Sequence, residues 1–356
     1  MRTRLTPLRW RMEEAQVDGL VVTNLVNVRY LTGFTGSAAV LAVTGDGAVL
    51  TTDGRYRTQS AEQVQGPVEV AVGGLEAQRT AVRDLVGAAA RVGLEADHVT
   101  WNGSRRWAEL LEGVDVVPTS GLVEALREVK DEEEIELMAR AAAIADAALG
   151  EVLPELAPGI TETAFAQLLD SAMRRGGAEG TAFETIVAAG PNSAKPHHRP
   201  GDRVVRRGDA VVVDFGATYE GYRSDMTRTF CAGGEPEGEL ARGFDVVRDS
   251  QAQGVAAVRA GVAAKDVDAV CRRVIDEAGW AERFEHGTGH GVGLDIHEAP
   301  TVSPLGTAIL APGMIVTVEP GVYLPGTGGV RIEDTLVVTE DGGRPLTAFA
   351  KTVAVN

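Results

Sequence analysis

The chain has 356 residues, a length typical of two domains, and its 44% hydrophobic and 24% charged residues are typical of a soluble globular protein. Its net charge of −17 argues against nucleic acid and anionic membranes as partners. No apolar run approaches the roughly 20 residues that span a bilayer, no apolar segment follows the basic N-terminus, and two cysteines are too few for a disulfide framework. We therefore expect a cytoplasmic protein.

Residues 1–125 alternate between short apolar runs and helical patterns, which predicts an α/β domain with a mixed sheet. The predicted elements are strands at 19–23, 38–43 and 48–51, helices at 55–64 and 76–90, a strand at 92–95, a helix at 104–111 and a strand at 114–117. The glycine-punctuated segment 30–37 is predicted to be a loop. Asp53 is predicted to cap the helix that begins near Arg55.

A long helix at 130–156 is predicted to lead into a second domain, residues 126–356. Acidic residues fill its first turn, where the helix dipole favours them, and Pro154 and Pro158 end it. Beyond it, the predicted elements are helices at 163–175, 239–259 and 265–278 and strands at 184–188, 210–215, 221–230, 314–318 and 335–338. Because their order is not strictly βαβ, we predict an α+β domain with a curved antiparallel sheet and helices on one side.

Two aspartates lie in strand-like runs of this second domain. Asp214 ends Val-Val-Val-Asp-Phe-Gly, and Asp225 lies in Ser-Asp-Met-Thr-Arg-Thr-Phe. A charge in such a run is costly unless something pairs with it. Asp214 could sit in a strand-end turn, and Asp225 could pair with Arg223 or Arg228. The spacing also suits two adjacent strands of a hairpin, which would bring both carboxylates together.

Segment 286–333 adds histidines and further carboxylates. His286, His290 and His297 fall within twelve residues, although the chain has six histidines in all. Glycines flank His290 and allow a close backbone approach. Glu319 ends Val-Thr-Val-Glu, and Glu333 ends Val-Arg-Ile-Glu. Each of these residues alone could be structural, but charges seldom lie unpaired in apolar strands, so we interpret them as one site.

Two Asp, two Glu and one His form a set that suits two divalent ions held side by side. The candidate ligands are Asp214, Asp225, His290, Glu319 and Glu333. Arg331 alternates onto the same strand face as Glu333 and could orient a neighbouring carboxylate. His197 and His198 lie in a loop before the strands, where they could be solvated or could donate to a reacting carbonyl.

This set, with the phrases His-Gly-Thr-Gly-His-Gly-Val-Gly-Leu-Asp-Ile-His-Glu and Val-Glu-Pro-Gly, resembles the M24 metallopeptidases with the pita-bread fold. The phrases Tyr-Leu-Thr-Gly-Phe-Thr-Gly and Thr-Asp-Gly-Arg-Tyr are similar to the creatinase-type N-terminal domain of its proline-specific branch. That branch contains Xaa-Pro aminopeptidases and Xaa-Pro dipeptidases. The resemblance covers nearly the whole chain, and it implies a homodimer and peptide substrates with proline second.

The resemblance also implies roles for the ligands. Asp214 would bind one metal ion, Asp225 and Glu333 would bridge two ions, and His290 and Glu319 would complete the second. A water or hydroxide between the ions would be the nucleophile, with Glu319 as general base. The family's usual metals are Mn²⁺ or Co²⁺, and Zn²⁺ is possible. A carboxylate-rich set favours Mn²⁺.

Three histidines match family positions at the reacting centre. The resemblance implies that His197 and His297 contact the substrate and stabilise the tetrahedral intermediate. It gives His286 a further active-site position, and Arg331 completes the predicted catalytic set.

An Xaa-Pro bond has no amide N–H, so an apolar pocket must recognise the ring, with Phe183 and Tyr323 as candidate walls. A dipeptidase must also bind the proline carboxylate, usually with an arginine. No arginine occurs in His297-Glu-Ala-Pro-Thr-Val-Ser-Pro, which favours an aminopeptidase for longer peptides over a dipeptidase. Arg55, from this chain or a dimer partner, is the alternative clamp.

Two other classes remain open at this stage. A creatinase-like hydrolase would use the same fold without metal, and the complete ligand set argues against it. A non-catalytic binding protein on this fold would tend to lose ligands and gain basic tails, and neither feature occurs in this sequence.

Overall fold

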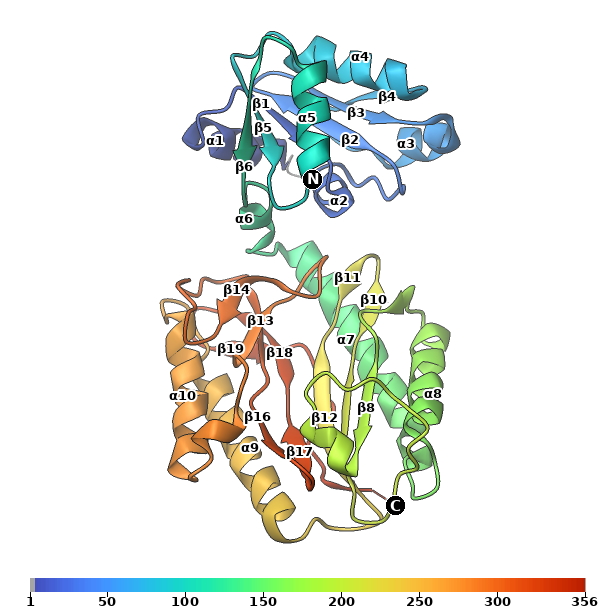
Figure 1. The fold of residues 1–356 in the computed structure, drawn as a ribbon, viewed down its shortest axis with the longest axis vertical. Helices are drawn as coiled ribbons and strands as arrows, with labels where there is room; N and C mark the ends of the chain where they lie inside the picture. The colour runs from blue at the N-terminus through green and yellow to red at the C-terminus, as the bar shows by residue number, and fades with distance from the viewer. Residues whose placement is uncertain (1–3, 356) are drawn as a thin grey trace. The chain divides into compact units, whose positions relative to one another are not determined.

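The computed structural model describes residues 4–355, which divide into two compact units, with the boundary along the chain between Arg127 and Glu128 (Figure 1). Each unit has its own sheets and its own core, and the two are described separately.

The N-terminal unit contains a six-stranded sheet in the order β4-β3-β2-β1-β5-β6. The central strand β1 pairs antiparallel with β2 and parallel with β5, so the sheet is mixed, as predicted. Its strands are β1 (Gly19–Val22), β2 (Val40–Thr44), β3 (Ala48–Thr52), β4 (Glu69–Val72), β5 (Arg91–Glu95) and β6 (Asp115–Thr119). Its helices are α1 (Leu5–Glu14), α2 (Leu25–Thr32), α3 (Arg57–Gln63), α4 (Leu75–Val86), α5 (Trp101–Leu110) and α6 (Glu124–Arg127).

Helix α2 corrects the predicted loop at 30–37, because the first three residues of that segment are helical. The Asn24 side chain accepts from the Val26 N–H at the start of α2, and Gly33, at φ 79°, ends it. Glycine adopts this left-handed conformation without strain. Asp53 caps the short 3₁₀ turn Gly54–Tyr56 that precedes α3.

The C-terminal unit has two helix pairs and several small sheets, whose strands pair antiparallel except for Ala354 and Val355, which run parallel to Cys231 and Ala232. Its helices are α7 (Glu132–Val152), α8 (Glu162–Arg175), α9 (Gly238–Ala257) and α10 (Ala264–Glu277). The first group of strands is β7 (Gly180–Thr181), β8 (Ile186–Ala189), β9 (Ala210–Phe215), β10 (Ala217–Tyr219), β11 (Tyr222–Arg223) and β12 (Met226–Ala232). The second is β13 (Gly289–Gly291), β14 (Glu298–Val302), β15 (Ile315–Val318), β16 (Gly321–Leu324), β17 (Gly328–Arg331), β18 (Asp334–Val338), β19 (Gly343–Pro345) and β20 (Ala354–Val355).

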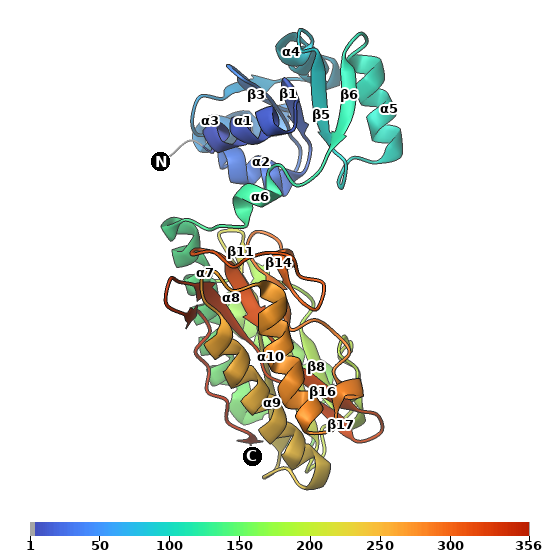
Figure 2. The ribbon, with the colours of Figure 1, turned by 90° about the vertical axis from the view of Figure 1, so that its left-hand side faces the viewer.

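Each helix pair of this unit covers one group of strands. Figure 1 shows α7 and α8 beside β8 and β12, and α9 and α10 on the other side, beside β16 and β18. Figure 2 shows α9 and α10 running side by side. The predicted α+β class and antiparallel pairing are confirmed. The predicted single strand at 221–230 is wrong, because Ser224 and Asp225 are not in strand conformation and separate β11 from β12.

Helix α7 begins later and ends earlier than the predicted helix 130–156. Asp131 and Glu134 form a capping box at its start, in which each side chain accepts from the backbone N–H of the other residue. After Val152, a 3₁₀ turn that contains Pro154 replaces the α-helix, because proline cannot donate the next helical hydrogen bond.

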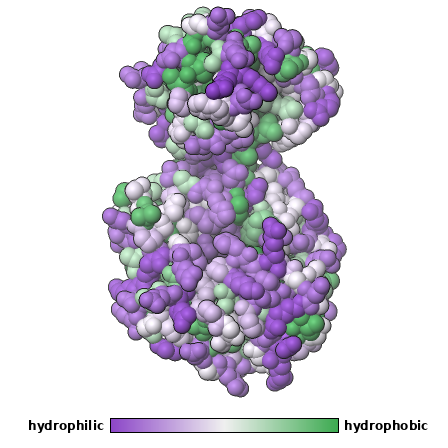
Figure 3. Space-filling model, viewed as in Figure 1, coloured by the Kyte–Doolittle hydropathy of each residue, from purple (hydrophilic) through white to green (hydrophobic). Residues whose placement is uncertain are grey.

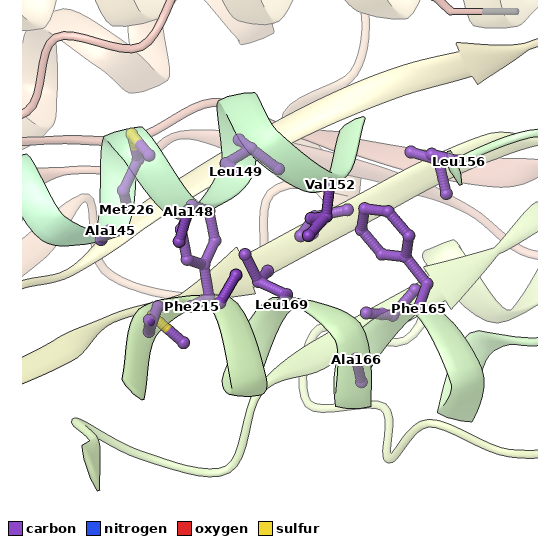
Figure 4. Close-up of a cluster of buried hydrophobic side chains, with 14 of the residues drawn as sticks. Ala145, Ala148, Leu149, Val152, Leu156, Phe165, Ala166, Leu169, Phe215 and Met226 are labelled. Atoms are coloured by element: carbon purple, nitrogen blue, oxygen red, sulfur yellow. The ribbon is translucent and has the colours of Figure 1, made fainter. Parts of the chain in front are cut away.

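The core beneath β9 and β12 fixes which side chains of these strands face the helices. Figure 4 shows Phe215 and Met226 among apolar side chains of α7 and α8, including Leu149 and Leu169. Met226 pairs with Phe215 across the two strands. Since successive side chains of a strand point to opposite faces, burial of Phe215 turns its neighbour Asp214 away from this core.

On the face shown in Figure 3, most of the visible surface is hydrophilic, with small hydrophobic groups scattered over it. Within residues 4–355, no helix is both long and apolar enough to cross a membrane.

Candidate active site

The second unit contains a cleft of about 550 Å³, within the range of small-molecule sites. The lining residues relevant to the chemistry are Phe183, Glu184, His197, His198, Arg199, Asp214, Asp225, His286, His290, His297, Thr301, Glu319, Arg331 and Glu333. All five candidate metal ligands are therefore in one cleft, together with the three predicted catalytic histidines and Arg331.

Asp214 and Asp225 enter the cleft from the paired strands β9 and β12. Thr227 pairs with Asp214, and Asp225 lies directly before β12. The alternative ion pairs for Asp225 do not form: Arg228 binds Asp334 at 2.8 Å, and Arg223 donates to the carbonyl oxygens of Leu294 and Ala182. Asp225 is thus a buried carboxylate with no arginine of its own strand beside it.

Close backbone packing places His290 beside the carboxylates. A Cβ on Gly289 would lie 2.0 Å from the Thr317 carbonyl oxygen, and one on Gly291 would lie 2.2 Å from that of Ala299, so only glycine fits at these positions. His290 Nδ1 lies 2.9 Å from the Gly291 carbonyl oxygen and must carry the proton to donate to it. Nε2 then presents a lone pair, the arrangement of a metal-binding histidine.

His290 Nε2 lies 3.4 Å from Glu319 Oε1 and 3.6 Å from Asp225 Oδ2. The ligand atoms of Asp225, His290 and Glu333 all lie within 4.8 Å of one another. Burial lowers the pKa of His290 to about 4, so the imidazole is neutral near pH 7 and cannot neutralise these carboxylates.

Arg331 connects the cleft to the surrounding side chains through every nitrogen of its guanidinium group. Nη2 donates to Asp214 Oδ2 at 2.7 Å, and Nη1 donates to the Tyr323 hydroxyl at 2.9 Å and the Pro196 carbonyl oxygen at 3.3 Å. Nε lies 3.2 Å from Thr227 Oγ1. Although burial opposes its charge, Tyr323, Asp214 and Glu319 raise the pKa of Arg331 well above its ordinary value.

The hydrogen bonds continue in one direction from Arg331 to His286. The Tyr323 hydroxyl accepts from Arg331 and lies 2.8 Å from His286 Nε2, to which it donates. His286 Nδ1 lies 2.8 Å from the Gly287 carbonyl oxygen and donates to it. Burial, and then the charge of Arg331, lower the pKa of His286 to about 4, which keeps the imidazole neutral, as this chain of donors requires.

Three carboxyl groups of the cleft have raised pKa values. Burial is the largest cause for each, and carboxylate neighbours add to it: the pKa of Glu319 rises to about 8, and those of Asp225 and Glu333 rise well above their ordinary values. Glu333 Oε2 accepts from Thr227 at 2.7 Å, whereas buried Oε1 accepts no hydrogen bond from any described residue. Crowded oxygen ligands, one of them without a donor, and a lone pair on His290 Nε2 are what a divalent cation satisfies, so these residues fit a metal site.

The remaining predicted residues lie in different surroundings. The ring of His297 packs edge-on against that of His290, with 4.4 Å between centroids. His197 is exposed at the cleft and Phe183 is half-buried there. Tyr323 is only 4% exposed and contacts Arg331 and His286. Arg55 lies in the N-terminal unit, where Asp53 accepts from its Nε at 2.9 Å and its Nη2 at 2.8 Å.

Sequence reasoning missed the residues that hold the His197 loop. Buried Glu162 at the start of α8 accepts from both ends of this loop. No local pattern identifies Glu162, because its partners lie 27 to 39 positions away along the chain. Arg199 was visible in the sequence beside the two histidines, but its place in the cleft was not predicted.

Two family models cover the two units. The model of metallopeptidase family M24 matches residues 136–340, and that of the creatinase/prolidase N-terminal domain matches residues 4–129. Among relatives, an uncharacterised peptidase of Bacillus subtilis, YqhT, is 42% identical, with 99% of each chain covered.

Two solved structures have the same fold over nearly their whole length. The Xaa-Pro dipeptidase from Bacillus anthracis is 39% identical, with a TM-score of 0.95 and 99% of each chain covered. The X-Pro aminopeptidase from Thermotoga maritima is 36% identical, with a TM-score of 0.90 and 99% of each chain covered.

These findings define the protein as a hydrolase, a peptidase with a creatinase-type N-terminal domain. The chain belongs to metallopeptidase family M24. The predicted resemblance and fold class are thereby confirmed, and the family implies divalent metal, for which Asp225, His290 and Glu333 form a possible site.

Proposed function

We propose that this protein is an exopeptidase with two divalent metal ions, which hydrolyses the Xaa-Pro bond at the N-terminus of peptides. The observation that carries the proposal is the cleft in which Asp214, Asp225, Glu319, Glu333 and His290 converge. Two structures with the same fold support the proposal, because they are named an Xaa-Pro dipeptidase and an X-Pro aminopeptidase.

The residues that would hold the two ions, as the family resemblance implies, are Asp214, Asp225, His290, Glu319 and Glu333. When bound, the ions would supply Lewis-acid chemistry, which polarises a carbonyl group and makes water nucleophilic at neutral pH. The carboxylate-rich set supports Mn²⁺ as the native metal.

The chain's own residues orient this centre and handle protons. Arg331 fixes the Asp214 carboxylate with a short charge-assisted hydrogen bond of 2.7 Å. Glu319, which lines the cleft, is the group proposed to accept a proton from the attacking water. His197 and His297 line the cleft, and we propose that they contact the substrate and stabilise the developing oxyanion.

Recognition of proline must rest on shape, because the Xaa-Pro bond lacks an amide N–H. Phe183, Ile186 and Ile296 supply apolar surface in the cleft. We propose that the proline ring packs against this surface, with Phe183 as one wall.

We propose the aminopeptidase activity on longer peptides as the main reaction. The segment after His297 contains no arginine, and neutral Thr301 lines the cleft there. Dipeptidase activity is the second candidate, and exposed Arg199 at the same cleft favours it. By resemblance, we also propose that the protein is a homodimer.

The deciding experiment follows release of the first residue from Xaa-Pro-Yaa and from Xaa-Pro. The full-length protein is stripped with a chelator and assayed with and without Mn²⁺. Metal-dependent cleavage is expected, with the tripeptide preferred. Absence of metal-dependent cleavage of both substrates would refute the peptidase proposal.

A further inference from the structure

We propose that Arg199 binds the C-terminal carboxylate of a dipeptide substrate and thereby sets how well Xaa-Pro competes with longer peptides. The inference rests on the proposed function and adds a specificity-determining residue to the same cleft. It follows from three features of the structure: the charges of the cleft, the anchoring of the loop that carries Arg199, and the exposed ion pair that Arg199 forms.

The first feature is the small number of arginine and lysine side chains that line the cleft. Five carboxyl groups line it, those of Asp214, Asp225, Glu319, Glu333 and Glu184. A dipeptide brings its own carboxylate into the cleft directly after the proline ring. Unless a cation or another donor faces it there, this carboxylate loses its hydration without compensation.

Only two of the cleft's lining residues are arginines, and none is a lysine. Arg331 is 3% exposed and already donates to Asp214, Tyr323 and Pro196. The Arg199 side chain, by contrast, is 83% exposed. Among the described lining residues, Arg199 is therefore the cation that an entering carboxylate can reach.

The second feature is a buried anchor for the backbone around Arg199. Glu162 Oε2 lies 2.8 Å from His198 Nε2 and accepts from the Gly201 N–H at 3.1 Å, so the residue before Arg199 and a residue just after it bind the same oxygen. The other oxygen accepts from Ala189 and Asn192 at 2.8 and 3.0 Å. The Glu162 side chain is fully buried.

This anchor fixes the loop while leaving the Arg199 side chain exposed. A loop held at both ends loses less conformational entropy when its side chain binds a ligand. Because His197 is on the same loop, the anchor also fixes the spacing between His197 and Arg199 along the cleft.

The third feature is the partner that Arg199 already has. Its Nε lies 3.2 Å from Glu184 Oε2, and the Glu184 side chain is 64% exposed. An exposed pair of this kind is weak, because water competes for both charges. The terminal edge of the guanidinium group matches a second carboxylate, which can form two parallel hydrogen bonds with it. A substrate carboxylate can thus displace Glu184 from Arg199, or share Arg199 with it, at little cost in free energy.

The substrate's own chemistry explains why this contact would discriminate by length. In Xaa-Pro the atom group after the ring is a carboxylate, whereas in Xaa-Pro-Yaa it is a neutral peptide bond. An amidated dipeptide, Xaa-Pro-NH₂, has the size of the dipeptide without its charge. Comparison of the acid with the amide isolates the Arg199 contact from all other contacts.

The test compares Ala-Pro with Ala-Pro-NH₂ on the full-length, Mn²⁺-loaded protein. Arg199→Gln is expected to lower kcat/KM for the acid on the order of tenfold more than for the amide, as the loss of a charged hydrogen bond implies, and mainly through KM. Arg199→Lys should restore part of the difference. Glu184→Gln should raise the preference for the acid severalfold, since it removes the competing carboxylate.

Arg206→Gln is the matched control, because Arg206 is an exposed arginine of the same connection and does not line the cleft. It should leave the ratio of acid to amide within twofold of the wild type. Equal losses on acid and amide in Arg199→Gln would overturn the inference, as would a change of ratio in Arg55→Gln and not in Arg199→Gln. Failure of the wild type to cleave any of Ala-Pro, Ala-Pro-NH₂ and a tripeptide Xaa-Pro-Yaa would instead refute the proposed function.

Discussion

Two arginine–carboxylate pairs line the same cleft and differ in their surroundings. Arg331 and Asp214 are 2.7 Å apart, with side chains 4% and 14% exposed. Arg199 and Glu184 are 3.2 Å apart, with side chains 83% and 64% exposed. The buried pair cannot separate without leaving a charge unpaired away from water, whereas the exposed pair can exchange partners freely. The first therefore fixes geometry, and the second is available for recognition.

The largest effect is expected from breaking the buried pair. Arg331→Gln removes the donor to Asp214 and the charge beside it, and should lower kcat/KM or metal affinity by about 100-fold, the upper range for groups that orient metal ligands. Metal content and kcat/KM of the purified variant measure this loss.

Arg331→Lys provides the control for charge alone. Lysine lacks the planar fork that contacts Asp214, Tyr323 and Thr227 together, so it should recover little of the activity. Full recovery in this variant would show that charge, and not orientation, is what Arg331 supplies.

The second effect is the pH dependence of metal binding by the buried carboxyl groups. In the metal-free protein, burial raises the pKa of Glu319 to about 8, so near pH 7 this group holds a proton that a cation must displace, and burial also raises the pKa values of Asp225 and Glu333. Mn²⁺ affinity should rise with pH by up to about tenfold per unit for each proton released. His290, with a pKa of about 4, adds no proton in this range.

Titration calorimetry at pH 6.5 and 8.5, in two buffers of different ionisation enthalpy, counts the released protons. Glu319→Gln should release fewer of them. Because these folded-state pKa values are raised, the metal-free protein should also lose stability as pH rises toward the folded-state values. Affinity that is independent of pH, with no proton release, would contradict this account.

The third effect isolates the hydroxyl between Arg331 and His286. Tyr323→Phe keeps the packed ring but removes the oxygen that accepts from Arg331 and donates to His286. We expect about a tenfold fall in kcat/KM, the cost of leaving these polar groups without a partner. The thermal midpoint controls for folding. Unchanged kinetics would mean that Arg331 and His286 are held well enough without this hydroxyl.

The smallest effect distinguishes the exposed pair from the buried one. Raising the salt concentration from about 0.05 to about 0.5 M shortens the screening length from about 14 to about 4 Å. This change should lower the preference for Ala-Pro over Ala-Pro-NH₂ about two- to threefold. Cleavage of the amide measures any general effect of salt. A preference that does not respond to salt would indicate that the carboxylate is bound away from solvent, and not at exposed Arg199.

Much of the site was predictable because charges in apolar strands are conspicuous. Asp214, Glu319 and Glu333 each end a run of buried strand residues, and the glycines around His290 indicated the close approach that Gly289 and Gly291 make. The fold class followed from the order of the elements. These features are local, so the sequence displays them directly.

The features that were not predicted depend on contacts between distant segments. The break before β12 lies against Gly216, where a Cβ would lie 1.9 Å from the Ser224 carbonyl oxygen. Arg331 meets Asp214 across 117 positions, and Glu162 meets His198 across 36. No periodicity or motif encodes such pairs, because tertiary packing alone brings them together.

The chain itself orients the ligands of the proposed metal centre. Arg331 holds Asp214, Thr227 holds Glu333, and the Gly291 carbonyl oxygen fixes the tautomer of His290. Burial raises the pKa values of Asp225, Glu319 and Glu333, which favours their neutral forms and so reduces the repulsion among them. Asp214, Glu333 and His290 thus each have a partner within the chain, whatever ion they bind. Loss of the metal would leave all three side chains with that partner.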